Sequence, residues 1–240
     1  MTARRVHLPP GSIEGGRARL GPAERHYLRD VLRLAPGAEV EVFDGRGGRH
    51  QGRLEDGLET ILLGPREEAP LPPVEIALLF ALAKGEKVDL VVQKATELGA
   101  GRILPFEAER SVVRLGHEKG AERARRWARI AAEAARQCGR SDVPEVSAPA
   151  PLAEALGRLP PATRLLLFQP GGGALPRLEP GAAPSLAAIV GPEGGLAPAE
   201  IEVCERAGAA AAGLGPRILR AETAAIVAVA LLQARYGDLS

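Results

Sequence analysis

The hydrophobic pattern of the chain changes at about residue 70. In the first part, apolar and polar residues alternate over short runs, as at Val40 and Val42 between acidic neighbours, which predicts half-buried strands. A hairpin turn is predicted at Asp44-Gly45. One helix is predicted after Pro22, because apolar residues recur there at helical spacing. The first part is therefore predicted to be a small, mostly β domain.

The second part alternates buried strands with amphipathic helices. Nearly continuous apolar runs suit strands covered on both faces, whereas apolar residues at spacings of three and four predict helices. Strands are predicted at 74–82, 102–106, 164–168, 186–190 and 209–214, and helices at 86–98, 121–138, 198–207 and 222–236. This alternation predicts an α/β domain with a largely parallel sheet. The last helix is apolar nearly all round, so we expect it to be buried in the core or against a second copy of the chain.

A stretch rich in proline and charge separates the two patterns. Residues 64–73 contain four prolines, and such a stretch cannot form a helix or an inner strand. We therefore predict a β domain at 1–68, a linker at 69–73 and an α/β domain at 74–240. A chain of 240 residues is long enough to bury a core in each domain.

Composition narrows the class of protein further. The chain is 45% hydrophobic and 25% charged, which is ordinary for a globular protein. No apolar run is long enough to cross a bilayer and no signal core is evident, so we expect a cytoplasmic protein without a membrane partner. The four histidines are scattered, and Cys138 and Cys204, expected to be reduced core residues, lack a metal-binding spacing. No metal is expected.

The charge is unevenly distributed although the net charge is only +1. Residues 1–33 carry seven arginines against three acidic residues, and residues 102–140 carry ten basic residues against five acidic ones. Segregated basic surfaces favour binding of a polyanion, and the ordinary alternative is a set of solvated charged faces. The candidate contacts are Arg4, Arg5, Arg25, Arg29, Arg125, Arg129, Arg136 and Arg140.

Two glycine-proline turns follow predicted strands near the end of the chain. The first is Gly191–Gly195, and the second opens the stretch 214–223. Both follow the carboxyl end of a strand, where ligands bind in open α/β sheets. Glycine lets the backbone approach a ligand closely, while Glu193 would repel a phosphate and suits a positive centre. The turns therefore predict a pocket for an uncharged base joined to a cationic group.

Both turns resemble the cofactor-loop motifs of the RsmE family. The matching segments are 189–196, with the sequence Ile-Val-Gly-Pro-Glu-Gly-Gly-Leu, and 214–224. Members of this family are SPOUT-class methyltransferases that use S-adenosylmethionine to methylate N3 of a uridine in 16S ribosomal RNA. The resemblance extends over nearly the whole chain through 85–87, 93–99, 109–111 and 137–145, and the first domain resembles the PUA-like barrel of the family.

The resemblance implies a fold, a cofactor and partners. The fold is a SPOUT-type parallel sheet with a C-terminal trefoil knot, preceded by a small PUA-like β-barrel domain. The cofactor is S-adenosylmethionine, with S-adenosylhomocysteine as the product, and the partners are 16S ribosomal RNA or the small ribosomal subunit and a second copy of the chain. The implied cofactor contacts are Leu167, Phe168, Gly191, Pro192, Glu193, Gly194, Gly195, Leu214, Gly215, Ile218, Leu219, Arg220, Thr223 and Ala224.

Two charged residues are the candidates for catalysis. Arg220 could stabilise a developing imide anion, and Glu222 could accept the N3 proton of the base. The alternative for Glu222 is a favourable charge in the first turn of a helix. Two other functions stay open, namely a SPOUT enzyme acting on another RNA such as tRNA, and an RNA-binding assembly factor with a vestigial pocket.

Overall fold

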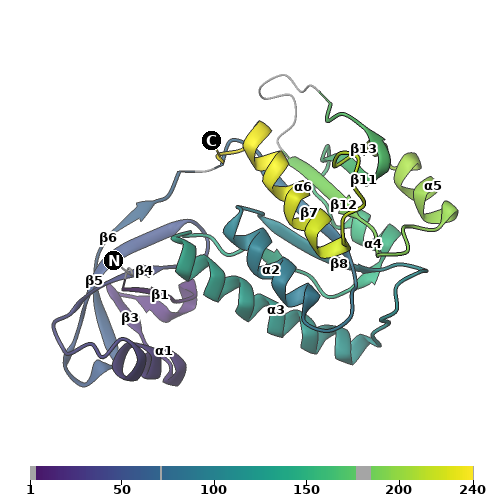
Figure 1. Cartoon of the computed structure of the whole chain (residues 1–240). Helices are drawn as coiled ribbons and strands as arrows, with labels where there is room; N and C mark the ends of the chain where they lie inside the picture. Colours follow the sequence, from purple (N-terminus) through teal and green to yellow (C-terminus); the bar gives the residue numbers. More distant parts are fainter. Residues whose placement is uncertain (1–3, 71, 177–184, 240) are drawn as a thin grey trace. The chain divides into compact units, whose positions relative to one another are not determined.

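The computed structural model describes residues 4–70, 72–176 and 185–239 (Figure 1). Two compact units are present, Met1–Leu71 with Ala132–Val143, and Pro72–Ala131 with Pro144–Ser240. Leu71, in the predicted linker, lies outside the described residues. The last turns of helix α3 (His117–Cys138) belong to the first unit, which the sequence pattern does not predict.

A six-stranded sheet forms the first unit. Its strands are β1 (Arg5–His7), β2 (Ile13–Glu14), β3 (Arg17–Arg19), β4 (Glu39–Phe43), β5 (Gly48–Leu54) and β6 (Thr60–Glu68). They follow the order β1-β4-β5-β6-β3-β2, with β1 parallel to β4 and the other pairs antiparallel. The alternating residues of β4 are buried as predicted, with Val40 and Val42 in the core of the unit. Helix α1 (Pro22–His26) continues into a π-helical turn, Tyr27–Val31.

Strand β6 extends into the stretch that the sequence predicts to be free of inner strand. Residues up to Glu68 pair with β5, but those after Leu62 have no partner in β3, so this part of β6 is an edge strand and agrees with the prediction. The register shifts between His50 and Gly52, opposite Pro65, while β3 pairs only with residues 60–62 of β6. Proline is tolerated at such a bulge, because no second strand lies beside it there to accept a hydrogen bond from the N–H that proline lacks.

One arginine of the first unit is almost fully buried. Arg5 is 4% exposed, and its guanidinium pairs with Glu41 of β4 at 2.5 Å. It also donates to the carbonyl of Arg140 at 3.0 Å and to those of Ala135 and Arg136 at 3.4 Å. Carbonyls at a helix end lack intrahelical partners and carry partial negative charge. The guanidinium of Arg5 supplies both a hydrogen-bond donor and a positive charge at the end of α3.

A parallel sheet forms the centre of the second unit. Its strands are β7 (Glu75–Ala81), β8 (Arg102–Glu107), β9 (Glu145–Val146), β10 (Ala150–Pro151), β11 (Arg164–Gly173), β12 (Ser185–Val190) and β13 (Ala210–Ala212). The order is β10-β8-β7-β12-β11-β13, with β9 also beside β8, and the described pairs are all parallel. The predicted α/β class with a parallel sheet is therefore confirmed.

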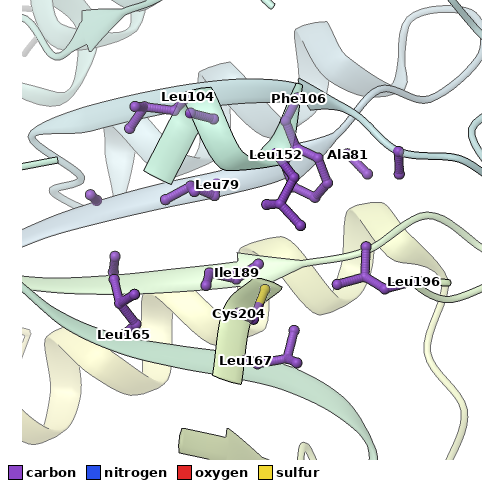
Figure 2. Close-up of a cluster of buried hydrophobic side chains, with 14 residues drawn as sticks. Leu79, Ala81, Leu104, Phe106, Leu152, Leu165, Leu167, Ile189, Leu196 and Cys204 are labelled. Atoms are coloured by element: carbon purple, nitrogen blue, oxygen red, sulfur yellow. The ribbon is translucent and has the colours of Figure 1, made fainter. Parts of the chain in front are cut away.

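Helices cover both faces of this sheet (Figure 1). They are α2 (Lys87–Glu97), the first part of α3, α4 (Leu152–Gly157), α5 (Pro198–Arg206) and α6 (Ala221–Tyr236). Figure 2 shows one core layer, in which Leu79 and Ile189 of the strands pack with Leu152 of α4 and Cys204 of α5. Alternate strand residues point to the opposite face, where α6 packs against α2, β7 and β12. Both faces are apolar because both are covered.

Three side chains refine the sequence predictions. Cys204 is buried, and burial raises the pKa of its thiol to about 11, so it stays protonated. Cys138 is exposed, so its expected place in the core is wrong. Helix α6 buries one face only, since Leu231 on the other face is 39% exposed. No helix in the described ranges is long and apolar enough to cross a membrane.

Replacing Arg5 with methionine is expected to lower the free energy of unfolding by about 3 kcal/mol, because the partly buried Glu41 carboxylate and the helix-end carbonyls lose their partner. Urea denaturation of the full chain, followed by circular dichroism, measures this change. Arg53→Ala is the control, since Arg53 and Glu39 form an exposed pair on the same sheet and should contribute little. Equal losses in the two variants would contradict the buried role of Arg5.

Candidate functional site

A pocket lies beyond the carboxyl end of β12 and beside the middle of β11, where the pairing of these two strands ends. Its volume is about 240 Å³. It is lined by the middle of β11, the end of β12 and the turn after it, one residue of α5, the loop before α6 and the start of α6. The lining residues are Leu167, Phe168, Gln169, Pro170, Val190, Gly191, Pro192, Glu193, Gly195, Leu196, Ile201, Ile218, Leu219, Ala221 and Ala224. This is the edge of a parallel sheet at which ligands bind.

A second hollow of about 50 Å³ shares part of this wall. Phe168, Leu219 and Ala224 line both spaces, and Leu214 and Gly215 line only the smaller one. Together the two spaces approach the lower limit of small-molecule sites, roughly 300 Å³. The two predicted glycine-proline turns therefore lie beside the same pair of adjoining pockets.

Two backbone segments cross beside these pockets. The amide of Gly213 donates to the carbonyl of Gly173 at 2.8 Å. A Cβ at Gly172 would lie 2.3 Å from the backbone of Ala212, and one at Gly213 would lie 2.4 Å from the Gly172 carbonyl oxygen. Side chains do not fit at this crossing. Glycine there holds the segment after Phe168 against the segment that leads to the second turn.

A lysine that the sequence predictions do not assign joins the two halves of the site. Lys87, the first residue of α2, donates from Nζ to Oε1 of Glu193 in the turn after β12. The same Nζ lies 3.4 Å from Oε2 of Glu222 in the first turn of α6. Oε2 is buried and accepts no hydrogen bond from the described residues, so at this distance the lysine is its ion-pair partner.

The charges of this cluster support one another. The hydrogen bond from Lys87 holds the pKa of the Glu193 carboxyl below its usual value, with smaller contributions from Arg220 and Lys84. The same bond with Glu193 raises the pKa of Lys87, and the charge of Glu222 adds to that increase. Both partners therefore remain charged at neutral pH.

The turn after β12 is also held from its other side. Arg110 donates to the carbonyl of Gly194 at 3.0 Å. A further hollow of about 80 Å³ lies there, lined by Arg110 and Lys84 together with Val112 and Glu193. The loops after β7 and β8 thus bring basic side chains to the rim of the main pocket.

The structure does not bring every predicted site residue to the pocket wall. Leu167 and Phe168 are buried in the middle of β11, where its pairing with β12 ends, and contribute to the pocket wall. Arg220 and Thr223 are exposed and line none of the described pockets, although their neighbours Ala221 and Ala224 do. The side chains of Arg220 and Thr223 therefore do not form part of the pocket wall. Gln169, Pro170 and Ile201 line the pocket without having been predicted, and no charge or motif signals them in the sequence.

The candidate RNA contacts differ in exposure. Four are exposed at the surface, namely Arg4, Arg29, Arg125 and Arg129. Three are half-buried and paired with acidic residues, Arg25 with Glu59, Arg136 with Glu133 and Arg140 with Asp142. The sequence places Arg5 among these contacts, but the structure buries its guanidinium at the end of α3, where RNA has no access.

The site has the chemical features of a pocket for a partly apolar ligand. Its walls combine aliphatic and aromatic side chains with backbone groups of two glycine-rich turns. At its rim a buried carboxylate oxygen has an unused acceptor position, beside an ammonium group. Within residues 4–70, 72–176 and 185–239, no group of three or more histidines, cysteines or acidic residues could hold a metal ion.

Comparison with known families gives the class of the protein. A family model described as RNA methyltransferase domain matches residues 70–233, and one described as RNA methyltransferase PUA domain matches residues 20–63. The fold and the pocket are thus those of an RNA methyltransferase that carries a PUA domain.

Individual relatives narrow the class to one family. Ribosomal RNA small subunit methyltransferase E of Bacillus subtilis is 31% identical over 226 residues, covering 87% of this chain and 86% of the relative. The protein of the same name from Synechocystis is 34% identical over 244 residues, covering 97% and 78%. The chain belongs to the ribosomal RNA small subunit methyltransferase E family.

Solved structures agree with this assignment. A putative methyltransferase from Legionella pneumophila, in complex with bound SAM, is similar with a TM-score of 0.87 and 31% identity over the full length of both chains. The small subunit methyltransferase E of Neisseria gonorrhoeae, bound to S-adenosyl methionine, has a TM-score of 0.87 and 31% identity, covering 99% of this chain and 100% of that one.

The backbone crossing beside the pocket can be tested with two neighbouring glycines. Gly172→Ala is expected to lower the free energy of unfolding by about 2 kcal/mol, because its methyl group overlaps the backbone of Ala212. Gly173→Ala is the control, since its Cβ would have only an ordinary contact at 3.9 Å. Thermal and urea unfolding compare the two. An equal effect at both positions would contradict the close approach at Gly172.

Proposed function

We propose that this protein transfers a methyl group from S-adenosylmethionine to N3 of a uridine in 16S ribosomal RNA of the small subunit. The observation that carries the proposal is the pocket at the carboxyl end of β12 and the middle of β11, together with the buried Oε2 of Glu222, which follows the lining residue Ala221. The names of the relatives and the cofactor bound in two similar structures support it.

The residues around the pocket fit the proposed cofactor. When bound, S-adenosylmethionine supplies a methyl group activated by a sulfonium. The apolar walls suit its adenine ring, and close backbone approach at the two turns suits its polar edges. A Cβ at Gly191 would lie 3.0 Å from Leu196, so glycine keeps this wall open. The proposed cofactor residues are Leu167, Phe168, Gly191, Pro192, Glu193, Gly194, Gly195, Leu214, Gly215, Ile218, Leu219, Arg220, Thr223 and Ala224.

The rim of the pocket holds the residues proposed for the chemistry. The N3–H of uracil is a weak acid, so its proton must leave as the methyl group is transferred. The Glu222 carboxylate has an unused acceptor oxygen and takes this proton. The exposed guanidinium of Arg220, two residues earlier in the chain, stabilises the negative charge that develops on the base.

Two separate surfaces are proposed to bind the RNA backbone. In the first unit, Arg4 and Arg29 are exposed, and in the second unit Arg125 and Arg129 are exposed on one side of α3. Spacing of four residues places the last two on the same helix face. Such surfaces contact phosphates without reading sequence, so they supply affinity and position the RNA.

The trefoil knot, the closed barrel and the homodimer remain parts of this proposal. β13 lies at one edge of the sheet, whereas α6 packs on β12 and β7, so the chain must cross back past β11. That path supports a knot. The outer face of α6, with exposed Leu231, and the 86% exposed Ile218 before it support burial against a second copy of the chain. The proposed substrate places the activity in the cytoplasm.

Methyl transfer from labelled S-adenosylmethionine to small ribosomal subunits that lack the modification tests the proposed function. The wild-type protein is expected to form 3-methyluridine, identified by mass spectrometry of the nucleosides. Glu222→Gln and Arg220→Ala are expected to lower turnover by at least about 100-fold, because a proton acceptor or a stabilising charge is lost. Affinity for S-adenosylhomocysteine, measured by calorimetry, should stay within tenfold.

Arg235→Ala is the matched control, because Arg235 is exposed near the opposite end of α6. Full turnover in either rim variant would remove that residue from the chemistry. Methylation of tRNA alone would redirect the proposal to another RNA, and absence of binding heat in the wild type would indicate a vestigial pocket.

Affinity for small-subunit RNA is expected to fall steeply with salt, and less steeply in the double variant Arg125→Ala/Arg129→Ala. Each lost phosphate contact lowers the slope of log affinity against log salt by roughly 0.7 to 0.9. Filter binding at several salt concentrations measures the slopes. Arg206→Ala serves as the control, since Arg206 lies on α5 and pairs with Glu202. A slope unchanged in the double variant would exclude the α3 surface.

A further inference from the structure

One ammonium group at the rim of the pocket is shared by two carboxylates. Lys87 begins α2, Glu193 belongs to the turn after β12, and Glu222 lies in the first turn of α6. Nζ of Lys87 donates to Glu193 and lies 3.4 Å from Oε2 of Glu222. Three segments that are distant in the sequence therefore meet at a single positive charge.

The two carboxylates differ in how much they need this charge. The side chain of Glu193 is 58% exposed, so water stabilises its ionised form even without a partner. The side chain of Glu222 is only 12% exposed, and its Oε2 accepts no hydrogen bond from any described residue. Burial disfavours a carboxylate, and a nearby cation opposes that effect. The charge of Lys87 therefore stabilises the carboxylate of Glu222 more than that of Glu193, although its contact with Glu222 is the longer one.

Several other basic groups lie near Glu193. Lys84, from the loop before α2, and Arg220, which precedes α6, both act on Glu193. Arg110, from the loop after β8, donates to a backbone carbonyl in the same turn as Glu193. Of these groups, Lys87 is the one seen within ion-pair distance of Glu222.

We propose that Lys87 is a positioning residue for methyl transfer, which keeps Glu222 ionised and aimed at the acceptor base while Glu193 holds the ammonium in place. This inference rests on the proposed function. N3 of the uracil loses its proton to Glu222 and uses the remaining electron pair to form the bond to the methyl carbon. The electron pair of the broken carbon–sulfur bond stays with S-adenosylhomocysteine. Lys87 itself neither gains nor loses a proton.

A simpler role for Lys87 would be to fix the turn after β12 through Glu193 alone. The two roles predict different responses to pH. If Lys87 acts on Glu222, its removal leaves a buried carboxylate without a counterion and raises the pKa of that carboxyl. A smaller fraction of Glu222 is then ionised at a given pH, so the acidic limb of the rate profile moves to higher pH. If Lys87 only fixes the turn, cofactor affinity falls and the limb stays in place.

The test combines Lys87→Met with Lys87→Arg and Glu193→Gln. In Lys87→Met we expect the acidic limb of the single-turnover rate to move up by roughly one pH unit or more. Lys87→Arg keeps the positive charge and is expected to restore the wild-type limb. Glu193→Gln leaves the lysine to Glu222 alone, so its limb should not move upward. Circular dichroism and thermal melting check that each variant is folded.

A second readout does not depend on activity. Carbon-13 NMR of the labelled glutamate carboxyl groups, with the Glu222 signal assigned from Glu222→Gln, measures the pKa of Glu222 directly. We expect a higher pKa in Lys87→Met than in the wild type, and a wild-type value in Lys87→Arg. An unchanged Glu222 pKa in Lys87→Met overturns the inference. A wild-type protein that shows this coupling but methylates no RNA would refute the proposed function and leave the coupling intact.

Discussion

The strands of the second unit run in one direction, and this constraint decides where chemistry can occur. Every strand of a parallel sheet ends at the same edge, so the loops after β7, β8, β11, β12 and β13 are brought together there. Both faces are covered by helices, so polar and charged side chains can gather only at the ends. The pocket, its glycine turns and its charged rim are all consequences of this arrangement.

The same constraint explains why much of the site could be predicted from the sequence. Apolar runs such as the one around Leu79 predicted the strands, and Gly191 and Gly215 marked the turns that follow two of them. The position of a turn along the chain predicts at which edge of the sheet the turn lies, but not which residues from other segments pack beside it. Gln169 and Ile201 therefore escaped prediction, because ordinary residue types become wall residues only through tertiary packing.

Charged residues were the least predictable feature for a related reason. Arginines at the surface and in the interior have the same sequence signature, so Arg5 could not be distinguished from Arg4 until its helix-end partners were known. The ion pairs of Lys87 could not be predicted from the residues around it either, since its two carboxylate partners lie more than a hundred residues away in the sequence. Long-range electrostatic contacts depend on the fold, whereas turns and apolar periodicity can be recognised within a short stretch of sequence.

The contacts of the buried Arg5 also mean that the first unit cannot be completed until a much later part of the chain has been synthesised. Its guanidinium belongs to the first strand, but the carbonyl of Arg140 that it contacts lies 135 residues later. A ribosome adding about 5–20 residues per second needs roughly 3 to 15 seconds to pass from the end of β6 to that carbonyl. During this interval the sheet of the first unit is fully synthesised yet lacks its last helical turns. The first unit therefore finishes folding only after synthesis of the second unit has begun.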